Sequence, residues 1–129
     1  MPVHIVRLGT PRLPGEGTRI GTVRRPPRGV LKAEFASGNW YDVWFPTLAP
    51  SAEAVKRALA ATTDAEWAAF TRAYRAEMAQ PEARHALSLL ATMSHGANFS
   101  VGCYCENEAR CHRSLLRLLL QEAGAQLAD

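Results

Sequence analysis

The sequence predicts an α/β fold: a compact three-layer domain with a mostly parallel central sheet flanked by helices. Three observations lead to this prediction. Short apolar segments of strand-like composition come first, amphipathic helical patterns follow, and the chain closes with a strand–loop–helix unit. The length of 129 residues suits a single domain spanning 1–129, and a content of 47% hydrophobic and 21% charged residues is ordinary for a globular protein.

The first part of the chain contains three predicted strands separated by loops. Val3–Leu8 and Arg19–Arg24 carry strand-like apolar residues, and Tyr41–Phe45 is rich in aromatic residues. Glycine and proline mark Gly9–Gly17 as a loop. Two consecutive prolines remove backbone donors from Arg25–Gly29, so this basic segment is predicted to be a stiff exposed loop.

Three helices are predicted in the middle of the chain. Ser51 is a suitable cap for a helix that reaches about Ala61, and Asp64 is expected to cap the next one. The second helix carries an apolar stripe at spacings of three and four, formed by Trp67, Phe70, Tyr74 and Met78. Pro81 suits the first position of a third helix, which reaches about Ser94 and should face inward with Ala86, Leu87, Leu90 and Met93.

The last unit is a buried strand followed by a buried helix. Asn98–Cys105 is the clearest strand of the chain, and the final helix should run from about Cys111 to Ala123, with Gly124 at its end. In open α/β sheets, ligands bind outside the carboxyl ends of the strands, and helix N-termini attract anions. The join between this strand and this helix is therefore the predicted functional site.

Charge and composition exclude several classes of protein. A net charge of +3 is too small to indicate nucleic-acid or membrane binding by itself, and no apolar run approaches the ~18 residues of a membrane span. The three cysteines all lie between Cys103 and Cys111, which argues against a secreted disulfide scaffold and for a reducing compartment. We therefore expect a cytoplasmic protein without a membrane partner. The sequence does not predict its oligomeric state.

The densest chemistry is Cys103-Tyr104-Cys105-Glu106 and, after four intervening residues, Cys111-His112-Arg113. These motifs resemble the domain-of-unknown-function family 488. Further segments fit the same family: Ile20–Gly29, Trp40–Trp44, Leu48–Ser51 and Trp67–Glu77. The resemblance implies a compact three-layer α/β domain and implies no activity. Cys105 departs from the simpler Cys–Glu pattern of the family, which leaves open whether Cys103 or Cys105 has any shared role.

The cysteines raise the question of a metal site. Cys103, Cys105, Cys111 and His112 supply enough ligands for zinc. However, residues two apart on a strand are separated by about 6.6 Å along the chain, whereas thiolates on one zinc nearly touch. Cys111 and His112 should diverge on a helix. We therefore expect no bound zinc and no cofactor, with Cys103 as a buried core thiol.

The candidate catalytic residues are Cys111, His112 and Glu106. A cysteine at a helix N-terminus beside cationic residues has a lowered pKa, so Cys111 should be the most reactive thiol. Glu106 is placed to orient an arginine or to act as a base. Cys111 and Arg117 imitate the Cys-x5-Arg loop of phosphatases, but the residues between them look helical, so Arg117 should point down the helix, away from a ligand.

The candidate ligand-binding residues are arginines together with Cys105. We expect Arg113 to converge with at least one of Arg24, Arg25 and Arg28 on an anion site, since arginine forks suit phosphate or carboxylate. The predicted function is binding of a small anionic or nucleotide-like ligand at residues 103–113, by a protein that could be an enzyme. The alternative is a non-catalytic module that binds nucleic acid or an acidic protein partner through the arginine loop.

Overall fold

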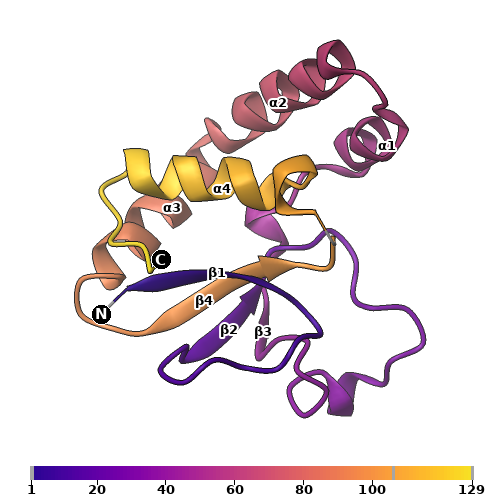
Figure 1. Cartoon of the computed structure of the whole chain (residues 1–129). Helices are drawn as coiled ribbons and strands as arrows, with labels where there is room; N and C mark the ends of the chain where they lie inside the picture. Colours follow the sequence, from indigo (N-terminus) through magenta and orange to yellow (C-terminus); the bar gives the residue numbers. More distant parts are fainter. Residues whose placement is uncertain (1, 106, 129) are drawn as a thin grey trace.

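The computed structural model describes residues 2–105 and 107–128 and shows a parallel sheet with α-helices over one side (Figure 1). Within these residues the sheet has four strands in the order β1-β4-β2-β3, and every neighbouring pair is parallel. The strands are β1 (Val3–Arg7), β2 (Thr18–Gly21), β3 (Val43–Trp44) and β4 (Phe99–Cys103). The predicted α/β class with a mostly parallel sheet is confirmed.

The central strand is β4, which is buried along its whole length. It pairs with β1 from Val3↔Phe99 to Arg7↔Cys103 and with β2 as far as Gly21↔Gly102. A strand with neighbours on both sides is expected to be short and apolar, and FSVGC fits this description. The strand ends at Cys103, two residues before the predicted end, and this early ending decides the geometry of the site described below.

The α-helices lie between β3 and β4 and after β4, whereas a loop alone joins β1 to β2. The α-helices are α1 (Ala52–Ala60), α2 (Asp64–Met78), α3 (Pro81–Met93) and α4 (His112–Glu122), and the short 3-10 helices are η1 (Lys32–Glu34), η2 (Pro46–Leu48) and η3 (Glu108–Arg110). Ser51 caps α1 and Pro81 begins α3, as predicted. The predicted cap of α2 is wrong: Thr63 is the cap, because its hydroxyl accepts from the Glu66 N–H while the Glu66 carboxylate accepts from the Thr63 N–H. Asp64 is the first helical residue.

The two sides of the sheet are covered differently (Figure 1). The α-helices lie over one side, whereas η1 and its flanking loops lie on the other. The third layer is thus built from irregular chain and a 3-10 helix rather than from α-helices. No helix within the described residues is long and apolar enough to cross a membrane.

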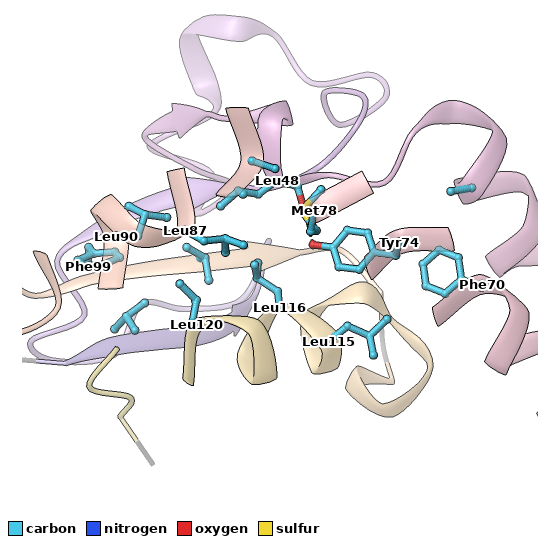
Figure 2. Close-up of a cluster of buried hydrophobic side chains, with 14 residues drawn as sticks. Leu48, Phe70, Tyr74, Met78, Leu87, Leu90, Phe99, Leu115, Leu116 and Leu120 are labelled. Carbon is cyan, nitrogen blue, oxygen red and sulfur yellow. Dashed lines mark hydrogen bonds between the residues drawn. The ribbon is translucent and has the colours of Figure 1, made fainter. Parts of the chain in front are cut away.

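The main core lies between the sheet and the α-helices (Figure 2). It includes Phe70 and Tyr74 from α2, Leu87 and Leu90 from α3, Phe99 from β4, and Leu115, Leu116 and Leu120 from α4. Met93, which the sequence pattern placed inward, is 41% exposed. A second buried cluster lies at the carboxyl end of the sheet, formed by Val6, Leu8, Val23, Tyr41, Cys103 and Cys111. The carboxyl end of the sheet is therefore where the sequence motifs meet.

Candidate functional site

The three cysteine side chains come together at the junction of β4 and α4. Cys103 is the last residue of β4, Cys105 lies beyond the strand end, and η3 returns the chain so that Cys111 becomes the N-cap of α4. The Sγ atoms of Cys103 and Cys105 are 3.7 Å apart. The premise that Cys-x-Cys spacing separates these thiols is wrong, because Cys105 is no longer part of the extended strand.

His112 is fixed beside the thiols by both ring nitrogens. Its Nδ1 lies 3.8 Å from Cys111 Sγ, and its Nε2 lies 2.7 Å from the carbonyl oxygen of Thr22. Thr22 is itself anchored on β4, since its N–H and its hydroxyl both donate to the Gly102 carbonyl at 3.0 Å. The Tyr74 ring meets the imidazole edge-on at 5.6 Å between centroids. Cys111 and His112, expected to diverge, are therefore in contact.

The three thiols differ in the direction in which their pKa values are shifted. Hydrogen bonds from Cys103 and Cys105, and a further one with His112, lower the pKa of Cys111 despite its burial. The hydrogen bonds of Cys103 with Cys105 and Cys111, together with burial, raise the pKa of Cys103. The hydrogen bond with Cys103 lowers the pKa of Cys105, but the interaction with Cys111 and burial raise it more. Cys111 is therefore the thiol that ionises first.

Accessibility follows a different order from ionisation. Cys111 is 2% exposed and His112 is 6% exposed, whereas Cys105 is only half-buried. The lowered pKa of Cys111 agrees with the expectation of a reactive thiolate, but a substrate or reagent reaches Cys105 first. Cys103 is buried, as expected. Glu106, the third catalytic candidate, lies outside the described residues.

Arg113 lies in the first turn of α4 and is 4% exposed. Its Nη2 donates to the carbonyl oxygen of Cys105, and its Nε has no hydrogen-bond partner among the described residues. Its positive charge also lowers the pKa of Cys105, although other effects outweigh it. A buried cation at a helix N-terminus opposes the helix dipole, so this arginine needs negative charge nearby.

The other arginines of the sequence analysis have different roles. Arg24 donates from Nε to the carbonyl of Pro50 and from Nη2 to the carbonyls of Pro46 and Ala49, so its guanidinium holds the chain entering α1. Arg25 and Arg28 are exposed on their loop. Arg117 does not point down the helix as expected, because its guanidinium reaches back to the Glu108 carboxylate at 2.9 and 3.1 Å.

The described residues show no interaction that joins Arg113 to Arg24, Arg25 or Arg28. The predicted convergence on one anion site therefore has no support from the contacts of the β4–α4 junction. Backbone carbonyls of residues 46–50 accept from the Nε and Nη2 of Arg24, and its convergence with Arg113 stays a prediction.

A pocket of about 520 Å³ lies on the side of the sheet that carries η1. Its wall includes Pro26, Val30, Lys32, Phe35, Tyr41, Asp42 and Trp44. The predicted strand Tyr41–Phe45 hid this pocket, because a residue in a regular strand is not expected to lie under a loop. In the structure only Val43–Trp44 is strand, and Tyr41 is buried under the loop that carries η1. The sequence feature that could have indicated the pocket is the group of aromatic residues near the basic loop with two prolines.

Tyr41 and Asp42 are two of the polar residues that line this pocket. The Tyr41 hydroxyl is buried, with the residue 3% exposed, and has no hydrogen-bond partner among the described residues. Burial raises the pKa of this phenol, so it stays a neutral donor. The Asp42 carboxylate is already satisfied, because it accepts two hydrogen bonds from Arg12 at 2.9 and 3.1 Å and one from the Arg19 N–H at 2.8 Å.

Fold and site together define an α/β protein with a Cys/His cluster at the carboxyl end of its sheet and an aromatic pocket nearby. The chain belongs to the DUF488-N3a family: the model of this family, described as an active DUF488-N3 subclade, matches residues 3–124. The resemblance to family 488 is thereby confirmed. No curated protein and no solved structure matches the chain.

Proposed function

We propose that the protein binds a small anionic, nucleotide-like ligand in the pocket between η1 and β3. The observation that carries this proposal is Tyr41, which lines a pocket of about 520 Å³ and whose buried hydroxyl has no hydrogen-bond partner among the described residues. Pockets for small ligands are mostly apolar, measure roughly 300–1,000 Å³ and contain a few well-placed polar groups. A ligand acceptor would satisfy this hydroxyl, which otherwise costs about 1–3 kcal/mol.

The walls of the pocket suit a ligand with a flat apolar part. Phe35 and Trp44 present aromatic faces, and Trp44 is 45% exposed while its indole N–H donates to the Val23 carbonyl at 2.8 Å. A tethered indole of this kind offers a stacking surface to a base at low entropic cost.

The charge around the pocket suits an anion. Lys32 lies in the wall, and the loop that contributes Pro26 also carries the exposed Arg25 and Arg28. Arg12 neutralises the one acidic side chain of the wall, Asp42, so no free carboxylate of the wall opposes the anion. Phosphate groups are the usual partners of such exposed cations.

Binding rather than catalysis is proposed, because the Cys111–His112 pair is too deeply buried for a substrate to reach its reacting atoms. We also propose a cytoplasmic location. Three clustered free thiols fit a reducing compartment, where they would not be oxidised.

A second candidate is binding of single-stranded nucleic acid on the same surface. The exposed Arg25 and Arg28 beside the half-exposed Trp44 favour it, since such binders combine basic grooves with aromatic stacking platforms. A nucleic-acid strand is larger than a nucleotide-like ligand, and its binding depends more steeply on salt.

Calorimetric titration with adenosine 5′-monophosphate, adenosine and inorganic phosphate tests the proposal. We expect the monophosphate to bind more tightly than either part alone. Tyr41→Phe should weaken binding about fivefold by removing one hydrogen bond, and Lys32→Gln about threefold by removing an exposed charge. Lys56→Gln is the matched control, because Lys56 is the only other lysine and lies exposed on α1.

Two outcomes would overturn the proposal. Equal effects of Lys32→Gln and Lys56→Gln would show nonspecific charge screening. Binding of an eight-nucleotide single strand that weakens steeply with salt, with no binding of the monophosphate, would replace the first candidate by the second.

A further inference from the structure

Four metal-binding side chains meet at the β4–α4 junction, and the proposed ligand pocket does not use them. They are the thiols of Cys103, Cys105 and Cys111 and the imidazole Nδ1 of His112. We propose that these four side chains bind one zinc ion. This inference goes beyond the proposed function and does not depend on it.

The distances fit a tetrahedral site. With Zn–S bonds of about 2.3 Å and Zn–N bonds of about 2.0 Å, two zinc-bound sulfurs lie about 3.8 Å apart, and a sulfur and a nitrogen about 3.5 Å apart. Cys103 and Cys105 are 3.7 Å apart at Sγ, and Cys111 Sγ is 3.8 Å from His112 Nδ1. The ligand atoms of Cys103, Cys111 and His112 all lie within 4.8 Å of one another. Cys105 joins this group through its contact with Cys103, and its side chain would turn toward the other ligands to complete the site.

The imidazole is already oriented as a ligand. His112 Nε2 lies 2.7 Å from the Thr22 carbonyl, which has no proton to give, so Nε2 carries the hydrogen and donates it. Nδ1 faces Cys111, and in the neutral imidazole that a metal binds it carries the lone pair. Metal-bound histidines nearly always donate their second ring N–H to a carbonyl or carboxylate in this way. The hydrogen bonds that hold Thr22 to Gly102 fix this acceptor on β4.

The local charge balance also fits. Three thiolates, one neutral imidazole and Zn²⁺ carry a net charge of −1. The buried Arg113, which donates to the Cys105 carbonyl and lies close enough to affect that thiol, supplies +1. The site thus explains a cation in the first turn of a helix, a position where the helix dipole disfavours it.

Burial indicates the role of the ion. Cys103, Cys111 and His112 are all buried, and four protein ligands leave no position for water or substrate, as in structural zinc sites. The ion would join the end of β4 to the start of α4 across the loop at 104–110. It would therefore hold the carboxyl end of the sheet together.

The first test is the metal content of the protein purified without chelator. We expect about one zinc per chain by elemental analysis. Exchange for Co²⁺ should give the intense visible bands of tetrahedral cobalt and a thiolate-to-cobalt charge-transfer band. A protein that contains less than a tenth of a zinc per chain and takes up no Co²⁺ would overturn the proposal.

Variants test the ligand set. Cys105→Ser, chosen because Cys105 is the least buried ligand, should lower zinc affinity at least 100-fold and reduce the charge-transfer band by about a third, from three thiolates to two. His112→Gln should also weaken zinc binding, whereas His85→Gln, at an exposed position of α3, should not. If His112→Gln does not fold, the zinc affinity of Cys105→Ser and the cobalt spectrum of the wild type still test the ligand set. Unchanged zinc affinity in Cys105→Ser would overturn the four-ligand site.

Discussion

Replacing Glu16 with glutamine removes half of a fully buried ion pair. The Glu16 carboxylate accepts hydrogen bonds from Arg19 Nε at 2.6 Å and Nη2 at 3.0 Å, from the Ser100 hydroxyl and from the Leu13 N–H. Arg19 also donates from Nη1 to the carbonyls of Thr10 and Asn39. The pair therefore connects Ser100 of β4 to the loops that carry Thr10, Leu13 and Asn39.

The pKa of Glu16 gives the size of the effect. Burial alone would raise it, but the hydrogen bonds from Arg19, Leu13 and Ser100 and the charge of Arg19 outweigh burial and lower the pKa from 4.5 to about 2. This difference corresponds to about 3 kcal/mol of folding stability, fully present above pH 4.5 and lost as the pH falls toward 2. Glu16→Gln also leaves Arg19 buried and unpaired, so the total loss at pH 7 should be about 3–5 kcal/mol.

Urea unfolding of the wild type and Glu16→Gln at pH 7 and pH 3 measures this loss of folding stability. The difference in unfolding free energy between the two proteins should shrink by about 2 kcal/mol at pH 3. At that pH the Glu16 carboxyl is mostly protonated in the unfolded chain, which stabilises the unfolded wild type. Glu122→Gln is the control, since its pair with Arg75 is exposed and should leave the midpoint nearly unchanged. A Glu16→Gln protein as stable as the wild type at pH 7 would refute this account of the ion pair.

Three further predictions concern single positions. Gly17→Ala should cost more than about 3 kcal/mol in urea unfolding, because an added Cβ would lie 2.0 Å from the Asn98 carbonyl oxygen; Gly29→Ala, at the same φ of +73° with no atom within 4 Å, should cost only about 1 kcal/mol. Arg24→Met should destabilise the fold by about 1–3 kcal/mol, measured the same way, by leaving carbonyls of residues 46–50 unpaired. Alkylation with peptide mapping should label Cys105 before the other thiols, and only after chelation; early labelling of a buried cysteine would contradict the site geometry.

Local patterns predicted the elements of the fold well. The stripe at Trp67, Phe70, Tyr74 and Met78 does lie on one helix, and the late apolar strand is the centre of the sheet. Strand ends were less predictable. The end of β4 depends on how far its neighbours pair with it, which no local pattern encodes, and an error of two residues reversed the interpretation of Cys105.

The contacts within the candidate site were also not predictable from local sequence patterns. The sequence placed the thiols, His112 and Arg113 in one region, because strand–loop–helix units bring such residues together. It did not show that Thr22, ninety residues away in the chain, orients His112. It also did not separate Arg24, which binds carbonyls near α1, from the exposed Arg25 next to it. These distinctions depend on tertiary contacts between distant segments.

The most direct test of the metal centre is X-ray absorption at the zinc edge on the purified protein. The account predicts a first shell of three sulfurs at about 2.3 Å and one nitrogen at about 2.0 Å. The same shell should lose one sulfur in Cys105→Ser. A shell of only nitrogen and oxygen, or an unchanged shell in Cys105→Ser, would contradict the assignment of zinc to Cys103, Cys105, Cys111 and His112.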